Sequence, residues 1–258
     1  MTKPVRRILV TNDDGINAPG LKAAVQIANA LSDDIWVVAP MEEKSGASHS
    51  LSLTQPLRLI KKGVQIYAVT GTPTDCVMFA TRHMLRDDLP ELVLSGVNFG
   101  QNIAEDVSYS GTVAAAKEGT LFGIPSMALS QAISLDNRNK IRFEVGVKHG
   151  PAIIRKLFKL DWPRDTLMNI NFPDIEPDAR CKVRITKQGK RDARILCLEE
   201  RIDPRNNSYY WYDFKRESIN AGRGTDIEAI LEGDISITPL KMDHTDTGTK
   251  KMLSALFG

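Results

Sequence analysis

Cysteine is scarce in this sequence, and its spacing excludes two kinds of stabilisation. The 258 residues contain three cysteines (Cys76, Cys181 and Cys197) and no CxxC pair. An odd number without that spacing argues against a disulfide framework and against a structural zinc site. The four histidines form no cluster with the cysteines of the kind that zinc requires. The composition fits a reducing compartment, and we expect a cytoplasmic protein.

Long apolar runs and a strong charge of either sign are also missing. No segment approaches the ~20 apolar residues of a membrane span, and the start, MTKPVRRILV, lacks the apolar stretch of a signal peptide. The formal net charge is only +2, too small to indicate a nucleic acid or an anionic membrane as partner. No GxxxxGK[ST] or GxGxxG motif occurs, which argues against a P-loop protein and leaves dinucleotide binding unsupported.

A regular alternation of apolar runs and amphipathic stretches fills the first two thirds of the chain. Strands are predicted at 7–10, 35–39, 64–69, 92–94, 125–129 and 168–170, and helices at 21–31, at 143–157, and from Thr72 and Ser110 onward. This order predicts an α/β fold, a three-layer, Rossmann-like, mostly parallel sheet with helices on both faces. The length suits one large domain, 1–258.

The composition changes after Pro173, where glycines, charges and aromatics replace the alternation. The segments VRITKQG, ARILCLEE and SYYWYDF indicate antiparallel β-structure, and GDISITPL a last buried strand. We therefore expect a core (about 1–175 and 225–240), a protruding C-terminal β-hairpin arm (about 180–222) and a C-terminal tail (241–258). A long hairpin cannot bury both faces by itself. The aromatic run at 209–212 then packs either on a second subunit or on the edge of its own domain.

Polar, glycine-containing loops follow the predicted strands. They have the sequences NDDG (12–15), SGAS (45–48), GTPTD (71–75) and SGVN (95–98), and SGT (110–112) opens a helix. The carboxyl ends of parallel strands meet at one edge of a sheet, where ligands bind. We expect these loops to converge on one site.

Two adjacent carboxylates, Asp13 and Asp14, stand directly after the first strand. Such a pair repels itself unless a cation lies between or beside the two groups. Hydroxyl and amide oxygens, such as those of Ser45 and Asn98, would complete the oxygen shell that magnesium, manganese or calcium accepts. A solvated turn or a helix cap is the alternative, disfavoured by the buried-type strand before the pair. The sequence thus predicts one divalent metal per subunit and an anionic substrate.

The helix start at 110–112 suits a phosphate. It offers free backbone N–H groups, two hydroxyls and the positive end of the helix dipole. An ordinary N-cap explains the same residues, and Gly46 has the same ambiguity. Asn102 is either a substrate-binding amide or a turn residue, and His49 is a candidate for acid–base work.

Several of these segments together resemble the SurE survival-protein nucleotidases. The blocks TNDDGINAPG, VVAPMEEKSGASHSLSL, GTPTDCV, LSGVNFGQN, YSGTVAAAKEG and GTDIEAILEGDISITPL match that family in order, over most of the chain. The resemblance implies metal-dependent hydrolysis of nucleoside 5′- and 3′-monophosphates, with polyphosphate as a further substrate of some members. It also implies a homodimer or homotetramer that exchanges the hairpin arm and the C-terminal tail.

Carried over by position, the resemblance also implies roles for individual residues. The implied metal ligands are Asp13, Asp14, Ser45 and Asn98, of which Asp13 and Asp14 are also the catalytic carboxylates. The implied phosphate or substrate contacts are Asn12, Gly46, Asn102, Ser110, Gly111 and Thr112.

The expected reaction is attack on the phosphate by a water molecule that the metal activates, with Asp13 or Asp14 as the base. Attack by one of these carboxylates, through an aspartyl-phosphate, is the alternative mechanism. Two other functions fit the same loops. One is a non-catalytic nucleotide sensor that signals through its assembly, and the other is a transferase with an acceptor other than water. Paired carboxylates favour the hydrolase, because such a site is costly to keep for binding alone.

Overall fold

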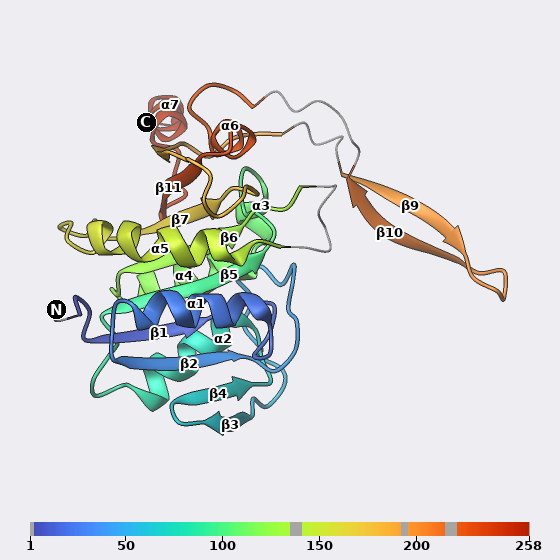
Figure 1. Cartoon of the computed structure of the whole chain (residues 1–258). Helices are drawn as coiled ribbons and strands as arrows, with labels where there is room; N and C mark the ends of the chain where they lie inside the picture. The colour runs from blue at the N-terminus through green and yellow to red at the C-terminus, as the bar shows by residue number, and fades with distance from the viewer. Residues whose placement is uncertain (1–2, 135–140, 192–195, 215–220, 258) are drawn as a thin grey trace.

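The computed structural model describes residues 3–134, 141–191, 196–214 and 221–257. A nine-stranded sheet lies between helices on its two faces, and a two-stranded hairpin stands apart from it (Figure 1). The strands are β1 (Arg7–Thr11), β2 (Asp34–Pro40), β3 (Leu59–Gly63), β4 (Ile66–Val69), β5 (Leu92–Phe99), β6 (Ser126–Gln131), β7 (Thr166–Phe172), β8 (Val183–Ile185), β9 (Leu196–Ile202), β10 (Ser208–Phe214) and β11 (Ile235–Lys241). The helices are α1 (Pro19–Asn29), α2 (Pro73–Phe79), the π-helical turn η1 (Ala80–Met84), α3 (Asp106–Tyr109), α4 (Gly111–Leu121), α5 (Phe143–Leu157), α6 (Asp226–Leu231) and α7 (Thr247–Phe257).

The order of the strands places a ligand site between β1 and β5. The order across the sheet is β3-β4-β2-β1-β5-β6-β7-β11-β8, and every neighbouring pair is parallel except β3 with β4 and β11 with β7. The chain goes from β1 to β2 on one side and later adds β5 on the other. Ligands bind outside the carboxyl ends of the strands at such a reversal. The predicted α/β fold with a mostly parallel sheet is confirmed.

Helices cover both faces of the sheet, which explains the unbroken apolar run of β1. Ile8 and Val10 belong to one hydrophobic cluster together with residues of α1 and α5. Leu9 belongs to a second cluster together with residues of α2 and α4. In Figure 1 α1 and α5 lie in front of the sheet and α2 behind it. Side chains of a strand alternate between faces, so a strand covered on both sides is apolar at every position.

Two helices start where their capping residues predict. Thr72 Oγ1 accepts from the backbone N–H of Asp75, whose carboxylate accepts from the N–H of Thr72, and Pro73 fills the first helical position of α2. Ser110 Oγ accepts from the N–H of Val113 at 3.0 Å, at the start of α4. Each cap satisfies an N–H group that the helix itself leaves unpaired.

The structure contains an unpredicted strand at one edge of the sheet and corrects the predicted pairing of the strand at the other edge. The strand predicted at 64–69 is confirmed as β4, and the preceding residues form β3, which was not predicted and pairs antiparallel with β4 around Gln65. The segment VRI, expected to be antiparallel, is β8, which pairs parallel with β11 in the central sheet. The strand β3 was missed because its charged and exposed residues obscure the apolar pattern, and the direction of β8 was wrong because its pairing partner is distant in the sequence.

The hairpin β9–β10 and the helix α7 leave apolar side chains uncovered. β9 and β10 pair antiparallel along their whole length, as predicted for the arm. Trp211 and Tyr212 are 58% and 75% exposed, and no residue of α7 is buried. Parts of the predicted arm, 192–195 and 215–220, lie outside the described residues, and the domain limits stay a prediction. None of the helices in the described part of the chain is long and apolar enough to cross a membrane.

Candidate metal and phosphate site

Asp13 and Asp14 lie at the reversal of strand order, directly after β1. Asp13 is buried and Asp14 is half-buried. Burial raises the pKa of Asp13 above its usual range, although hydrogen bonds from Thr112 and its neighbours oppose the shift. Burial, followed by the charge of Asp13, raises the pKa of Asp14 to about 7; Glu43 raises it too, against a hydrogen bond from Phe99. Two carboxylates that are costly to ionise together favour a bound cation.

The described part of the chain places no cationic side chain beside this pair. Within the described residues neither carboxylate lies within 4.0 Å of a lysine, arginine or histidine nitrogen. The same part of the chain contains no group of three or more His, Cys, Asp or Glu side chains arranged to hold a metal. Further ligands would therefore be hydroxyl or amide oxygens, which suit a hard divalent cation.

Ser45 and Asn98 carry such oxygens, and the neighbouring residues Lys44 and Phe99 bond to Asp13 and Asp14. The Ser45 hydroxyl donates to Glu43 Oε1 at 2.8 Å, so its oxygen keeps lone pairs for a ligand. Asn98 Nδ2 donates to the carbonyl of Gly100 at 2.9 Å, which leaves the amide oxygen as the group for a cation. The residues present thus fit a divalent metal.

Hydrogen bonds join four of the five loops that the sequence predicts to converge; the loop 71–75 is not among these four. The N–H of Lys44 donates to the carbonyl of Asp13 at 2.8 Å, and the N–H of Phe99 donates to Asp14 Oδ2 at 3.2 Å. The N–H of Ser48 donates to the carbonyl of Tyr109 at 3.1 Å. We call these loops, residues 12–15, 43–49, 98–102 and 109–112, the rim.

The N-terminus of α4 packs directly against Asp13. Thr112 Oγ1 donates to Asp13 Oδ1 at 2.5 Å, and the backbone N–H groups of Gly111 and Thr112 stabilise the charged form of that carboxylate. A Cβ on Gly111 would lie 2.8 Å from Asp13 Cβ and 3.1 Å from Pro73 Cγ. Glycine is therefore required for this approach. Carboxylate and helix start together make a place where a metal and a phosphate would meet.

Three of the residues predicted to contact the substrate form hydrogen bonds within the protein. Asn12 is buried, and its Nδ2 donates to the carbonyl of Gly15 at 3.0 Å, while its Oδ1 has no partner. Asn102 is buried, and its Nδ2 donates to Ser130 Oγ at 2.8 Å. Ser110 Oγ caps α4. These side chains hold the rim in shape, and their contact with substrate stays a prediction. Gly46, by contrast, has a φ of 76° and borders open space.

The structure also shows a pair of residues at the rim that sequence spacing did not connect. His49 Nε2 and Glu118 Oε2 lie 2.9 Å apart. Glu118 is buried in α4, so its carboxylate joins the 43–49 loop to the helix that carries Gly111 and Thr112. No short-range motif links two residues 69 positions apart, and only the fold brings them together.

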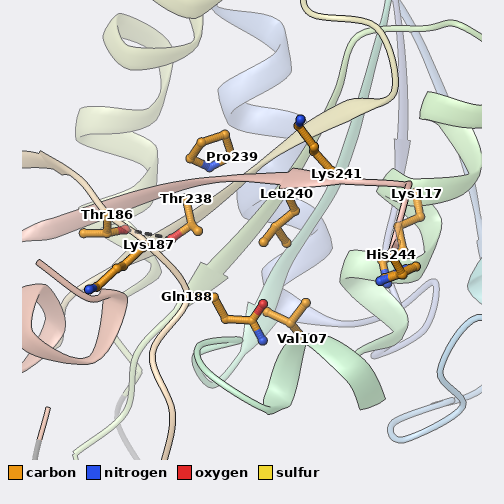
Figure 2. Close-up of a pocket in the computed structure, with 10 residues that line it drawn as sticks. All are labelled: Val107, Lys117, Thr186, Lys187, Gln188, Thr238, Pro239, Leu240, Lys241 and His244. Carbon is orange, nitrogen blue, oxygen red and sulfur yellow. Dashed lines mark hydrogen bonds between the residues drawn. The ribbon is translucent and has the colours of Figure 1, made fainter. Parts of the chain in front are cut away.

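A separate cavity of about 350 Å³ contains no residue of the rim. It is bordered by β11, α3, α4 and the residues after β8 (Figure 2). Three lysines and a histidine contribute to its lining: Lys117, Lys187, Lys241 and His244. Figure 2 shows the side chains of Lys187 and Lys241 pointing in different directions, so they do not converge on one anion.

Fold and rim define a doubly wound α/β protein with an acidic strand-end site facing a helix N-terminus. This class is consistent with the family resemblance of the motifs. The chain belongs to the SurE family, since the family model described as Survival protein SurE matches residues 8–195.

Individual relatives agree with this assignment. The chain is 54% identical to a protein of Parvibaculum lavamentivorans named 5′-nucleotidase SurE, over 98% of this chain and 91% of that protein. It is 53% identical to the protein of the same name from Azorhizobium caulinodans, over 97% of this chain and 98% of that one. The crystal structure of the SurE protein from Aquifex aeolicus is similar with a TM-score of 0.83 and 38% identity, over 98% of this chain and 100% of that one.

Proposed function

We propose that this chain is a metal-dependent 5′-nucleotidase that hydrolyses nucleoside 5′-monophosphates at the rim. The observation that carries this proposal is the pair Asp13 and Asp14, which lies against the start of α4 and in which burial raises the pKa of each carboxyl. Identity of about one half with curated proteins named 5′-nucleotidase SurE, over nearly the whole chain, supports it.

Asp13, Asp14, Ser45 and Asn98 would hold one divalent cation, Mg²⁺ or Mn²⁺. When bound, the ion supplies positive charge for the phosphate oxygens and lowers the pKa of water. The positive end of the α4 dipole would favour the phosphate oxygens, while the backbone N–H groups of Gly111 and Thr112 hold the Asp13 carboxylate. Thr112 keeps Asp13 in place, and a carboxylate of the pair orients the attacking water as base.

Phosphate release from a panel of compounds tests the proposal. The panel contains nucleoside 5′- and 3′-monophosphates and polyphosphate, each with EDTA or with added Mg²⁺ or Mn²⁺. We expect release from 5′-monophosphates that needs the divalent ion. Nucleotide binding without turnover would instead indicate a sensor, and a product that forms only with an added acceptor would indicate a transferase.

Thr112→Val should lower kcat/KM about tenfold, because it removes the hydroxyl that fixes Asp13 and leaves a buried carboxylate short of one hydrogen bond. Thr112→Ser keeps the hydroxyl and should retain most of the activity. Steady-state kinetics on a nucleoside 5′-monophosphate measures both. Equal losses in the two variants would contradict the role of this hydrogen bond.

We also infer that the arm and the tail join subunits of a homo-oligomer. Exposed aromatic residues of β10 and the uncovered apolar side chains of α7 support this. Replacing residues 196–214 by a short Gly-Ser linker should lower the mass seen in sedimentation. The residues from 187 to 191 stay in place, because Gln188 and Arg191 bond to the core. An unchanged mass would contradict the role of the arm.

A further inference from the structure

Two aromatic side chains on the surface of the α/β core lie at the rim. Outside the hairpin and α7, the exposed aromatic residues among those described are Phe99, 51% exposed, and Tyr109, 64% exposed. The other aromatic side chains of that part, such as Trp36 and Phe172, are half-buried or buried. Exposed apolar groups gathered at one place on a protein indicate a binding surface.

Phe99 stands beside the carboxylate pair. It is the last residue of β5 and follows Asn98, and its backbone N–H donates to Asp14 Oδ2 at 3.2 Å. This hydrogen bond fixes the position of the Phe99 backbone relative to Asp14. The Phe99 side chain therefore starts from a backbone position next to the groups that would bind the metal and the phosphate.

Tyr109 stands beside the other half of the site. It directly precedes the Ser110 cap of α4, and its carbonyl accepts from the N–H of Ser48. Its backbone thus joins the 43–49 loop to the start of α4, and its side chain is exposed there. Two exposed aromatic side chains thus come from two different loops of the rim, next to the proposed site for a phosphate ester.

On this arrangement, and resting on the proposed 5′-nucleotidase function, we propose that Phe99 and Tyr109 form a stacking platform for the base of the nucleotide. An aromatic face binds any base without reading its hydrogen-bonding edge. The platform selects nucleoside monophosphates over phosphate esters that have no base. It acts on binding, because a base distant from the phosphorus is held equally in the ground state and the transition state.

The test compares adenosine 5′-monophosphate with ribose 5-phosphate, which lacks the base. Phe99→Leu removes the aromatic face but keeps an apolar side chain and the backbone bond to Asp14. We expect it to raise KM for adenosine 5′-monophosphate about fivefold or more, with kcat within about twofold. The ratio of kcat/KM for adenosine 5′-monophosphate over ribose 5-phosphate should fall by the same factor. Tyr109→Leu should lower the same ratio.

Phe99→Trp retains an aromatic face and should keep the ratio of the wild type. Val64→Ala is the matched control, since Val64 is 84% exposed and lies between β3 and β4, away from the rim. An unchanged ratio in Phe99→Leu would overturn the platform, and so would an equal rise of KM for both substrates. A changed sedimentation mass with an unchanged ratio would assign the rings to a subunit interface instead.

Calorimetric binding of adenosine 5′-monophosphate and of ribose 5-phosphate to the same variants repeats the comparison without turnover. Binding that depends on the base and on Phe99 would support the platform even in a protein that releases no phosphate. Absence of phosphate release from the wild type with every divalent ion would overturn the proposed function. Failure of the stacking platform can therefore be distinguished from failure of the proposed 5′-nucleotidase function.

Discussion

Replacing both rim carboxylates, Asp13→Asn with Asp14→Asn, should abolish phosphate release from nucleoside 5′-monophosphates, with a loss of at least about 10³-fold in kcat. The amides keep the shape of the side chains and their ability to accept hydrogen bonds, so the fold should persist. They remove the negative charge that would hold the divalent ion. Phosphate release with added Mn²⁺ measures the loss, and circular dichroism checks the fold.

Metal binding can be followed in the same variant without turnover. Mn²⁺ should raise the thermal midpoint of the wild type, because a ligand that binds only the folded state stabilises it. The double variant should show no such rise. Asp87→Asn is the control, since Asp87 is an exposed carboxylate outside the rim. Near-normal activity or a normal Mn²⁺ shift in the double variant would remove the metal site from Asp13 and Asp14.

The single variant Asp14→Asn should be more stable than the wild type in EDTA at pH 8. The pKa of Asp14 is about 7 in the folded protein against 3.8 for the free side chain. The folded state therefore binds more protons than the unfolded state between these values, and the free energy of unfolding decreases as pH rises through that window. Asparagine does not titrate, so the variant does not lose this part of its free energy of unfolding as pH rises. Thermal unfolding at pH 5 and pH 8 measures the difference, and equal midpoints for the two proteins at pH 8 would contradict it.

Gly111→Ala should lower kcat/KM by about 10²-fold, because displacement of a catalytic group by about 1 Å has an effect of that size. The added Cβ would lie 2.9 Å from Asp13 Oδ2 and 2.8 Å from Asp13 Cβ. Asp13 is held on its other side by Thr112 Oγ1. The carboxylate must therefore shift, and the hydrogen bond with it. Steady-state kinetics and the Mn²⁺ shift of the thermal midpoint both report this displacement.

Gly123→Ala separates the effect on the site from a loss of stability. Gly123 has a φ of 72° and open space where a Cβ would be added. Alanine there strains the backbone by roughly 1 kcal/mol but contacts nothing in the rim. We expect a lower thermal midpoint with normal kinetics. If Gly111→Ala behaved like Gly123→Ala, the close approach to Asp13 would have no role in activity.

The sequence by itself determined the strands that are covered on both faces and the loops that follow them. β1 and β2 have uninterrupted apolar runs because helices pack on both sides. The cap at Thr72 and the start at Ser110 were readable because a hydroxyl before a helix has one local purpose. The acidic pair after β1 stood out in the sequence because adjacent carboxylates repel each other unless a cation lies beside them, and the metal at this pair stays a prediction.

Only the tertiary structure decided which residues meet from distant parts of the chain. The contacts of Thr112 with Asp13, of Glu118 with His49 and of Phe99 with Asp14 join residues 69 to 99 positions apart. No local pattern encodes them, because they follow from the strand order and from the packing of α4 on the sheet. The exposure of Phe99 is likewise a property of the fold, since whether a ring is buried depends on what packs around it. The direction of β8 was wrongly predicted for the same reason, since its pairing partner β11, and not its residue types, decides that direction.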